Sequence, residues 1–370
     1  MTLDTRSAGP EAPAVRPVPR PEIASLPRYS RAAGLAGVTW VASSNESTVP
    51  PSPAVQSAIA AAGAGVNRYP SLFGDRLTAA IAGRLGVPAE QVLAGAGSLP
   101  LLAQTLGAYT GAGTDVVHAW RSYEAYPILV AVAGAQSVRV PLDDGARHDL
   151  DAMLAAVTEQ TRVVIVCNPN NPTGTLRNHE DLVRFLERVP PHVLVVLDEA
   201  YREFTEPADD AVALLADFAN LVVLRTFSKA YGLAGARAGY LIASPEVAGT
   251  IRSAAPPFGL SMVAEAAALA AWHEPELMAE AVAAVARERA YLTAGLRHRG
   301  LSVPASGGNF VWIPADRALE LERECVRQSV SVRAFDGEGV RVTVGCREAS
   351  DAVLAAVDTL WPRSTGAPAG

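Results

Sequence analysis

Asn168-Pro169-Asn170-Asn171-Pro172-Thr173-Gly174 follows directly on the short apolar run Val163–Val166. Two residue–proline steps and a glycine favour a tight loop at the end of a strand. Because ligands of open α/β sheets bind at the carboxyl ends of strands, this loop is a candidate binding site. Taken alone, the same residues could also form a turn without a ligand.

Further apolar runs of four or five residues come later in the chain, at Val193–Leu197, Leu221–Leu224 and Gly239–Ile242. Continuous runs of this length are typical of strands that are covered on both faces. Between the strands predicted at Val163–Val166 and Val193–Leu197, residues 178–188 have an Asn cap and one apolar face, which predicts a helix. The alternation of strands and helices predicts an α/β fold with a mostly parallel sheet.

A second, smaller α/β unit is expected after Pro256-Pro257, which breaks this pattern. Residues 1–45 are expected to form an arm, 46–257 a large domain, and 258–370 a small domain against which part of the arm packs. The elements predicted in the small domain are a long helix over Pro275–Arg299, strands at Phe310–Ile313, Val330–Arg333 and Val340–Val344, and helices at Glu322–Gln328 and Ala349–Leu360.

Composition excludes several classes of protein. Of 370 residues, 49% are apolar and 19% charged, which is enough apolar material for a core and excludes a disordered chain. A net charge of −7 argues against sequence-independent nucleic-acid binding. No run of about 18 apolar residues and no signal-peptide pattern is seen, so we expect neither a membrane span nor export. Three cysteines without paired spacing fit a reducing, cytoplasmic compartment, and six histidines without ligand spacing predict no metal.

Charged residues follow two of the predicted strands. Asp198 begins Asp-Glu-Ala-Tyr (198–201), and Lys229 lies in Arg-Thr-Phe-Ser-Lys-Ala (225–230). A desolvated lysine has a lowered pKa and is a nucleophilic amine. Each residue also has a plain structural interpretation, because Asp often caps helices and most lysines are solvated.

A phosphate site is predicted from small and hydroxyl residues. Gly95-Ala96-Gly97-Ser98 precedes the helical run Leu99–Leu106, and small residues at a helix start place backbone N–H groups against an anion. Thr226, Ser228 and Arg237 can add hydroxyl donors and a guanidinium.

The order and spacing of Asn171, Asp198, Lys229 and Arg237 resemble those of the fold type I pyridoxal-phosphate aminotransferases. Within that family the chain is similar to the branch of histidinol-phosphate and aromatic aminotransferases. The motifs that carry the resemblance are Asn-Pro-Asn-Asn-Pro-Thr-Gly (168–174), Asp-Glu-Ala-Tyr (198–201), Ser-Lys-x-x-x-Leu-Ala-Gly-x-Arg (228–237) and Arg-Val-Thr-Val-Gly (341–345). The resemblance implies the family's two-domain α/β fold and pyridoxal 5′-phosphate as cofactor.

The resemblance also implies roles for single residues. Lys229 would bind the cofactor's aldehyde and then carry a proton, and Asp198 would keep the pyridine nitrogen protonated. Asn171 and Tyr201 would hydrogen-bond the phenolic oxygen, and Tyr123 would stack on the ring. The phosphate would be bound by Ser98, Leu99, Thr226, Ser228 and Arg237, and by Tyr69 of a partner subunit in a homodimer.

At the substrate end, the resemblance implies that Arg341 binds the α-carboxylate through its planar fork of donors. Tyr29, Asn171 and Arg333 are further candidates for substrate contact, although Arg333 could be a surface ion-pair partner. In the histidinol-phosphate branch, an arginine at the place of Arg333 touches the substrate's phosphate.

Three segments depart from the pattern of the family, and these changes are expected to cluster around the substrate entrance. Gly97–Pro100 replaces an acidic pair that many histidinol-phosphate enzymes carry. Trp120–Glu124 replaces a Pro-Thr-Tyr type segment, and Asn45–Pro51 lacks the usual aromatic residue. We therefore expect a transaminase that moves an amino group between an L-amino acid, preferably aromatic, and a 2-oxo acid by a ping-pong mechanism. The alternatives are a histidinol-phosphate aminotransferase, a decarboxylase of the same branch, and a non-catalytic sensor domain, which the acidic charge disfavours.

Overall fold

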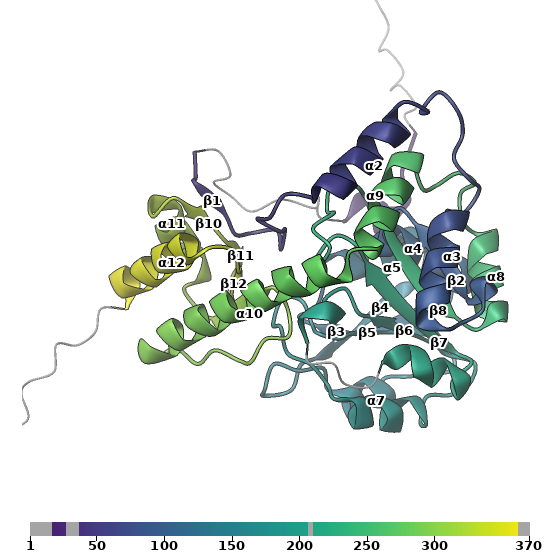
Figure 1. The fold of residues 1–370 in the computed structure, drawn as a ribbon. Helices are drawn as coiled ribbons and strands as arrows, with labels where there is room; N and C mark the ends of the chain where they lie inside the picture. The colour runs from purple at the N-terminus through teal and green to yellow at the C-terminus, as the bar shows by residue number, and fades with distance from the viewer. Residues whose placement is uncertain (1–16, 27–36, 206–209, 362–370) are drawn as a thin grey trace, which may run out of the picture.

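The computed structural model describes residues 17–26, 37–205 and 210–361. Its larger part is built on a seven-stranded sheet of order β2-β8-β7-β6-β5-β3-β4 (Figure 1). Strand β8 runs antiparallel to both of its neighbours, and the other pairs are parallel. The strands are β2 (Val92–Gly95), β3 (Asp115–Trp120), β4 (Gln136–Pro141), β5 (Thr161–Cys167), β6 (Leu194–Asp198), β7 (Leu221–Thr226) and β8 (Gly239–Ala243).

Helices cover both faces of this sheet, as the continuous apolar runs predict. Along β5, Val164 and Val166 pack into one apolar cluster, while Val163 and Ile165 pack into another on the opposite face. Successive side chains of a strand point to opposite faces, so a strand buried on both must be apolar throughout. The helices are α2 (Pro53–Gly63), α3 (Asp75–Leu85), α4 (Ser98–Tyr109), α5 (Ala125–Ala133), α6 (Leu150–Ala155), α7 (His179–Leu186), α8 (Pro245–Ser253) and α9 (Met262–Trp272).

The C-terminal part has its own sheet and its own apolar cluster. A three-stranded antiparallel sheet of order β11-β12-β9 packs against helices, and the long helix α10 connects it to the larger part (Figure 1). Residues 40–41 pair in parallel with residues 330–331, so an N-terminal segment joins this part. The elements are β1 (Trp40–Val41), α10 (Pro275–His298), β9 (Phe310–Pro314), α11 (Ala318–Arg327), β10 (Val330–Ser331), β11 (Arg333–Phe335), β12 (Gly339–Thr343) and α12 (Arg347–Leu360); a short α1 (Pro21–Ala24) lies near the N-terminus.

Two details of the fold differ from the sequence expectation. The strand expected over Val330–Arg333 is split, because Val330–Ser331 pairs with β1 whereas Arg333–Phe335 pairs with β12. Helix α9 was not expected before α10. Its buried alanines lie on one face, but nearly all of its other residues are apolar as well, so it lacks the contrast between an apolar and a polar face that periodicity detects. The domain boundaries at residues 45 and 257 stay predictions.

Among residues 17–26, 37–205 and 210–361, no helix combines the length and the apolar character that crossing a membrane requires.

The parallel strands all end at one edge of the large sheet. Strands β3, β5, β6 and β7 end at Trp120, Cys167, Asp198 and Thr226, and their registers place these ends side by side. Polar residues that follow different strands are thereby brought together at that edge.

Close backbone packing at this edge requires glycine at position 239. A Cβ there would lie 2.5 Å from the Ser98 nitrogen and 2.7 Å from the Gly97 carbonyl carbon, and neither backbone atom can move aside cheaply. We expect Gly239→Ala to lower the free energy of unfolding by about 1–3 kcal/mol, measured by urea denaturation. The matched control is Gly249→Ala in α8, where a Cβ meets nothing within 4 Å; it should be neutral or stabilising. Equal urea midpoints for the two variants would contradict the packing argument.

Candidate active site

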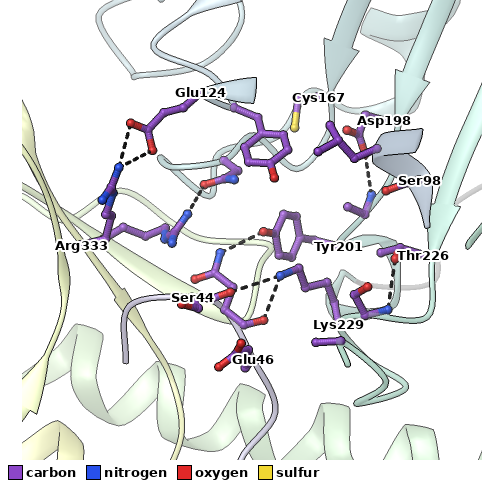
Figure 2. A pocket seen from close by; sticks show the side chains of 18 of the residues that line it. Ser44, Glu46, Ser98, Glu124, Cys167, Asp198, Tyr201, Thr226, Lys229 and Arg333 are labelled. Carbon is purple, nitrogen blue, oxygen red and sulfur yellow. Dashed lines mark hydrogen bonds and ion pairs between the residues drawn. The ribbon is translucent and has the colours of Figure 1, made fainter. Parts of the chain in front are cut away.

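A cavity of about 410 Å³ lies between the carboxyl edge of the large sheet and the C-terminal part (Figure 2). It brings together twelve of the fourteen residues that the sequence singled out. Its predicted lining residues are Ser98, Leu99, Tyr123, Asn171, Asp198, Tyr201, Thr226, Ser228, Lys229, Arg237, Arg333 and Arg341.

Two predicted site residues are not in this cavity. Tyr69 is 80% exposed and stacks on Phe258, with ring centroids 4.6 Å apart. A role of Tyr69 in the site of a partner subunit stays a prediction. Tyr29 lies outside the described residues.

Lys229 is the only lysine in the chain, so the predicted amine nucleophile has no competitor among the side chains. It follows β7 and is held by two backbone carbonyls, because its Nζ donates to Asn45 O at 3.1 Å and Ser44 O at 3.4 Å (Figure 2). Burial lowers the pKa of Lys229 to about 7, and the positive charge of Arg341 acts in the same direction. Near neutral pH a large share of the amine, about half at pH 7, is therefore unprotonated and nucleophilic.

Asp198 ends β6 and is held by two hydrogen bonds. The Tyr126 hydroxyl donates to Asp198 Oδ2 at 2.7 Å, and the Ala200 N–H donates to Oδ1 at 3.1 Å. Burial raises the pKa of Asp198, and these two bonds oppose that effect by stabilising the ionised form. A cationic group bound in the cavity would stabilise the carboxylate further.

Tyr126 was not among the residues that the sequence singled out, although it holds Asp198. Tyr126 lies three residues after Tyr123, and the two rings meet edge to face at 5.6 Å. Tyr123 lines the cavity and Tyr126 lies behind it, fully buried. Tyr123 lies two residues before α5 and Tyr126 lies in its first turn, and no local pattern in the sequence indicated a contact between Tyr126 and Asp198.

Asn45 is a second residue that the sequence did not single out. Its side-chain amide donates to the Tyr201 hydroxyl at 2.9 Å, and Thr343 donates to its side-chain oxygen at 2.9 Å. Its carbonyl accepts from Lys229, so Asn45 connects the N-terminal segment, the large sheet and β12. Asn45 has a positive φ of 53°, a conformation that Asn tolerates better than most residues.

An anion cradle lies at the N-terminus of α4. Ser98 begins this twelve-residue helix after Gly97, whose φ is 110°. Arg237 Nη1 donates to the Ser228 hydroxyl at 3.2 Å, and the Ser228 N–H donates to Thr226 Oγ1 at 3.1 Å. Helix N–H groups, hydroxyls and a guanidinium together form a phosphate-binding set.

Two arginines line the cavity from the C-terminal part. Arg341 is buried, donates from Nη1 to Asn171 Oδ1 at 2.6 Å, and donates from Nη2 to the Ser43 carbonyl at 2.5 Å. Arg333 donates from Nη2 to both Glu124 carboxylate oxygens at 3.1 Å.

The donor set fits pyridoxal phosphate. The cradle offers donors for a phosphate, Lys229 offers an amine for an aldehyde, and Asp198 offers a carboxylate for a protonated ring nitrogen. Glycine at position 97 leaves room for this arrangement, because a Cβ there would lie 2.8 Å from Arg237 Nη2.

Comparison with known proteins agrees with this chemistry. Residues 41–357 match the family described as aminotransferase class I and II. An aromatic amino acid aminotransferase from Streptomyces coelicolor is 47% identical, over 90% of this chain and 95% of its own. One from Thermobifida fusca is 46% identical, over 94% and 98%. The chain also resembles the solved histidinol-phosphate aminotransferase from Sinorhizobium meliloti in complex with pyridoxal 5′-phosphate, with a TM-score of 0.85 and 30% identity over 94% and 99% of the chains.

The lowered pKa of Lys229 makes a prediction about pH. In protein freed of cofactor, reductive alkylation of Lys229 by a small aldehyde should rise with pH and reach half its maximum near pH 7, because protonation below that pH blocks the amine. Peptide mass spectrometry can measure this without interference from other lysines. The N-terminal amine, with an ordinary pKa of about 7.7–8.0, is an internal reference. A midpoint near pH 10 would contradict the burial argument.

Proposed function

Because this chain belongs to the class I and II aminotransferases, enzymes that use pyridoxal phosphate, we propose that it moves an amino group between an aromatic L-amino acid and a 2-oxo acid. The observation that carries the proposal is the position of the only lysine, which lines one cavity together with Asp198 and the residues of the anion cradle. Two half-reactions that share one site give ping-pong kinetics.

We assign the cofactor's phosphate to Ser98, Leu99, Thr226, Ser228 and Arg237. Asn171 and Tyr201 are assigned to its phenolic oxygen, and Tyr123 to the face of its ring. When bound, pyridoxal phosphate supplies an aldehyde that condenses with amines and a ring that accepts the electrons of a broken Cα–H bond.

The protein's own groups then have separate tasks. Asp198 keeps a proton on the ring nitrogen, with Tyr126 fixing the orientation of the carboxylate. Arg341 binds the substrate's α-carboxylate, because its planar fork matches the two oxygens. Lys229 Nζ takes the proton from the substrate's α-carbon, which its lowered pKa permits near pH 7.

The preference for aromatic side chains rests on the relatives, since those at 42–47% identity are named aromatic amino acid aminotransferases. The departures at Trp120–Glu124 and Asn45–Pro51 lie beside the cavity, where Asn45, Glu46, Tyr123 and Glu124 are part of its lining.

The test is a single half-reaction without a 2-oxo acid. Phenylalanine should convert the absorption spectrum of the cofactor-loaded protein to that of the pyridoxamine form, and histidinol phosphate should do so more slowly. The Lys229→Ala control should lose turnover by roughly 10²–10⁴-fold, as expected for a missing acid–base group. Conversion by histidinol phosphate alone, or release of CO₂ without a keto product, would overturn the proposal.

We further propose a homodimer whose sites are shared between subunits. Tyr69, Phe258, Leu72 and Val66 are large apolar side chains that stay at least 40% exposed in the single chain. Exposed apolar clusters of this kind are typical of protein interfaces. Tyr69 of one subunit would then reach the phosphate site of the other.

Subunit mixing can test this arrangement. Lys229→Ala and Tyr69→Ala subunits, each weakly active alone, form mixed dimers in which one site has both residues intact. A statistical mixture should therefore regain about a quarter of the parent activity. Activity of the mixture equal to the mean of the two variants would contradict shared sites.

A cytoplasmic location is also proposed. Cys167, Cys325 and Cys346 are all free thiols, as is usual for proteins of reducing compartments.

A further inference from the structure

Thr343, the last residue of β12, exchanges two hydrogen bonds with Asn45. The backbone N–H of Asn45 donates to Thr343 Oγ1, and the Thr343 hydroxyl donates to Asn45 Oδ1, both at 2.9 Å. Asn45 and Thr343 are buried, with exposed fractions of 1% and 4%. A backbone N–H can only donate, so Thr343 Oγ1 accepts in the first contact and its single proton is used in the second.

This exchange fixes the orientation of the Asn45 amide. With its oxygen bound to Thr343, the amide turns its Nδ2 to Tyr201 and donates to the tyrosine hydroxyl at 2.9 Å. A reversed amide would accept from Tyr201 instead, and it would leave the Thr343 proton without an acceptor among the described residues. A buried donor without a partner is costly, so the observed orientation is favoured.

The orientation of the amide decides what the Tyr201 hydroxyl can do. Because Tyr201 Oη accepts from Asn45, the one proton of the hydroxyl is not used in that contact. Tyr201 lines the cavity (Figure 2), and no acceptor in the described part of the chain takes this proton. The Tyr201 ring packs edge to face on Phe310, with centroids 5.0 Å apart, so the ring is held while the proton can turn to the cavity.

We propose that Thr343 is a positioning residue, which acts through Asn45 to keep the Tyr201 hydroxyl a hydrogen-bond donor toward the cavity. The acceptor is the phenolic oxygen of pyridoxal phosphate, to which Tyr201 is assigned above. The inference deepens the proposed function and rests on it. A residue of the C-terminal part thereby sets the direction of a hydrogen bond made by a residue that follows β6.

The experiment is a pH titration of the visible absorption spectrum of the cofactor-loaded protein, without any amino donor. It measures the pH midpoint between the two absorbing forms that differ by one proton. A donated hydrogen bond stabilises the phenolic oxygen as an anion, which favours the form with the proton removed. Loss of that donor should therefore raise the midpoint. Thr343→Val should raise it by about one pH unit, in keeping with the strength of hydrogen bonds to charged groups.

Thr343→Ser is the matched control, because it keeps the hydroxyl and removes only a methyl group; its midpoint should equal that of the parent. Asn45→Gly removes the amide and suits the positive φ of 53° at this position, so it tests the same contacts if Thr343→Val folds poorly. Its midpoint should rise as well. These variants leave every charged side chain of the cavity in place, namely Glu46, Glu124, Asp198, Lys229, Arg237, Arg333 and Arg341.

Tyr201→Phe separates an effect through the tyrosine hydroxyl from a general loosening of the segment around Asn45. This variant removes the hydroxyl and should show the largest rise in the midpoint. In the Tyr201→Phe background, Thr343→Val and Asn45→Gly should add no further shift, because both act through that hydroxyl.

The outcomes separate this inference from the function on which it rests. Parent-like midpoints in Thr343→Val and Asn45→Gly overturn the role of Thr343. An equal rise in Thr343→Ser, or shifts that add in full to that of Tyr201→Phe, overturn it too, because the effect then does not pass through the hydroxyl. Transamination of phenylalanine is measured separately, and its absence in the parent refutes the proposed function while the spectral titration still decides the role of Thr343.

Discussion

The burial of one amine is the constraint on which the site depends. Lys229 is the only lysine, and its side chain reaches the backbone carbonyls of residues 44 and 45. An ammonium group loses hydration when buried, and Arg341 adds like charge, so the neutral form is favoured. All the other strongly basic side chains of the protein are arginines, which stay protonated and are not nucleophilic amines. Nucleophilic amine chemistry of side chains is thereby confined to one position.

That burial requires segments that are distant in the chain. Strand β7 places Lys229 at the sheet edge, but the carbonyls that hold it belong to the segment after β1. Asn45 connects this segment to Tyr201 and to Thr343 of β12, so the wall of the cavity is shared by the N-terminal, central and C-terminal parts. Positioning of the amine and closure of the cavity therefore depend on the same contacts. The ion pair of Glu124 and Arg333 extends this connection to the far side of the cavity.

Strands could be predicted from the sequence where a continuous apolar run is followed directly by a polar residue. The apolar runs of β5, β6 and β7 are buried on both faces, and the polar residue after each run is therefore placed at a common edge. Prediction failed where the structure of a segment depends on which strand pairs with it. A four-residue run at Val330–Arg333 carries no information about which strand pairs with it, and two different strands do. Helix α9 has no polar face for periodicity to detect.

The fold class could be predicted from the sequence alone, and Lys229, Asp198 and the small and hydroxyl residues of the anion cradle could be singled out as candidates. Each of these follows from residue type and position relative to a strand, which are local properties. The partners of these residues became known from the three-dimensional structure: Tyr126 contacts Asp198, Asn45 contacts Lys229 and Tyr201, and Glu124 contacts Arg333. The last of these pairs joins residues 209 positions apart. Such contacts arise from how helices, strands and loops that are distant in the chain pack against one another, and the local pattern around one partner does not specify the other.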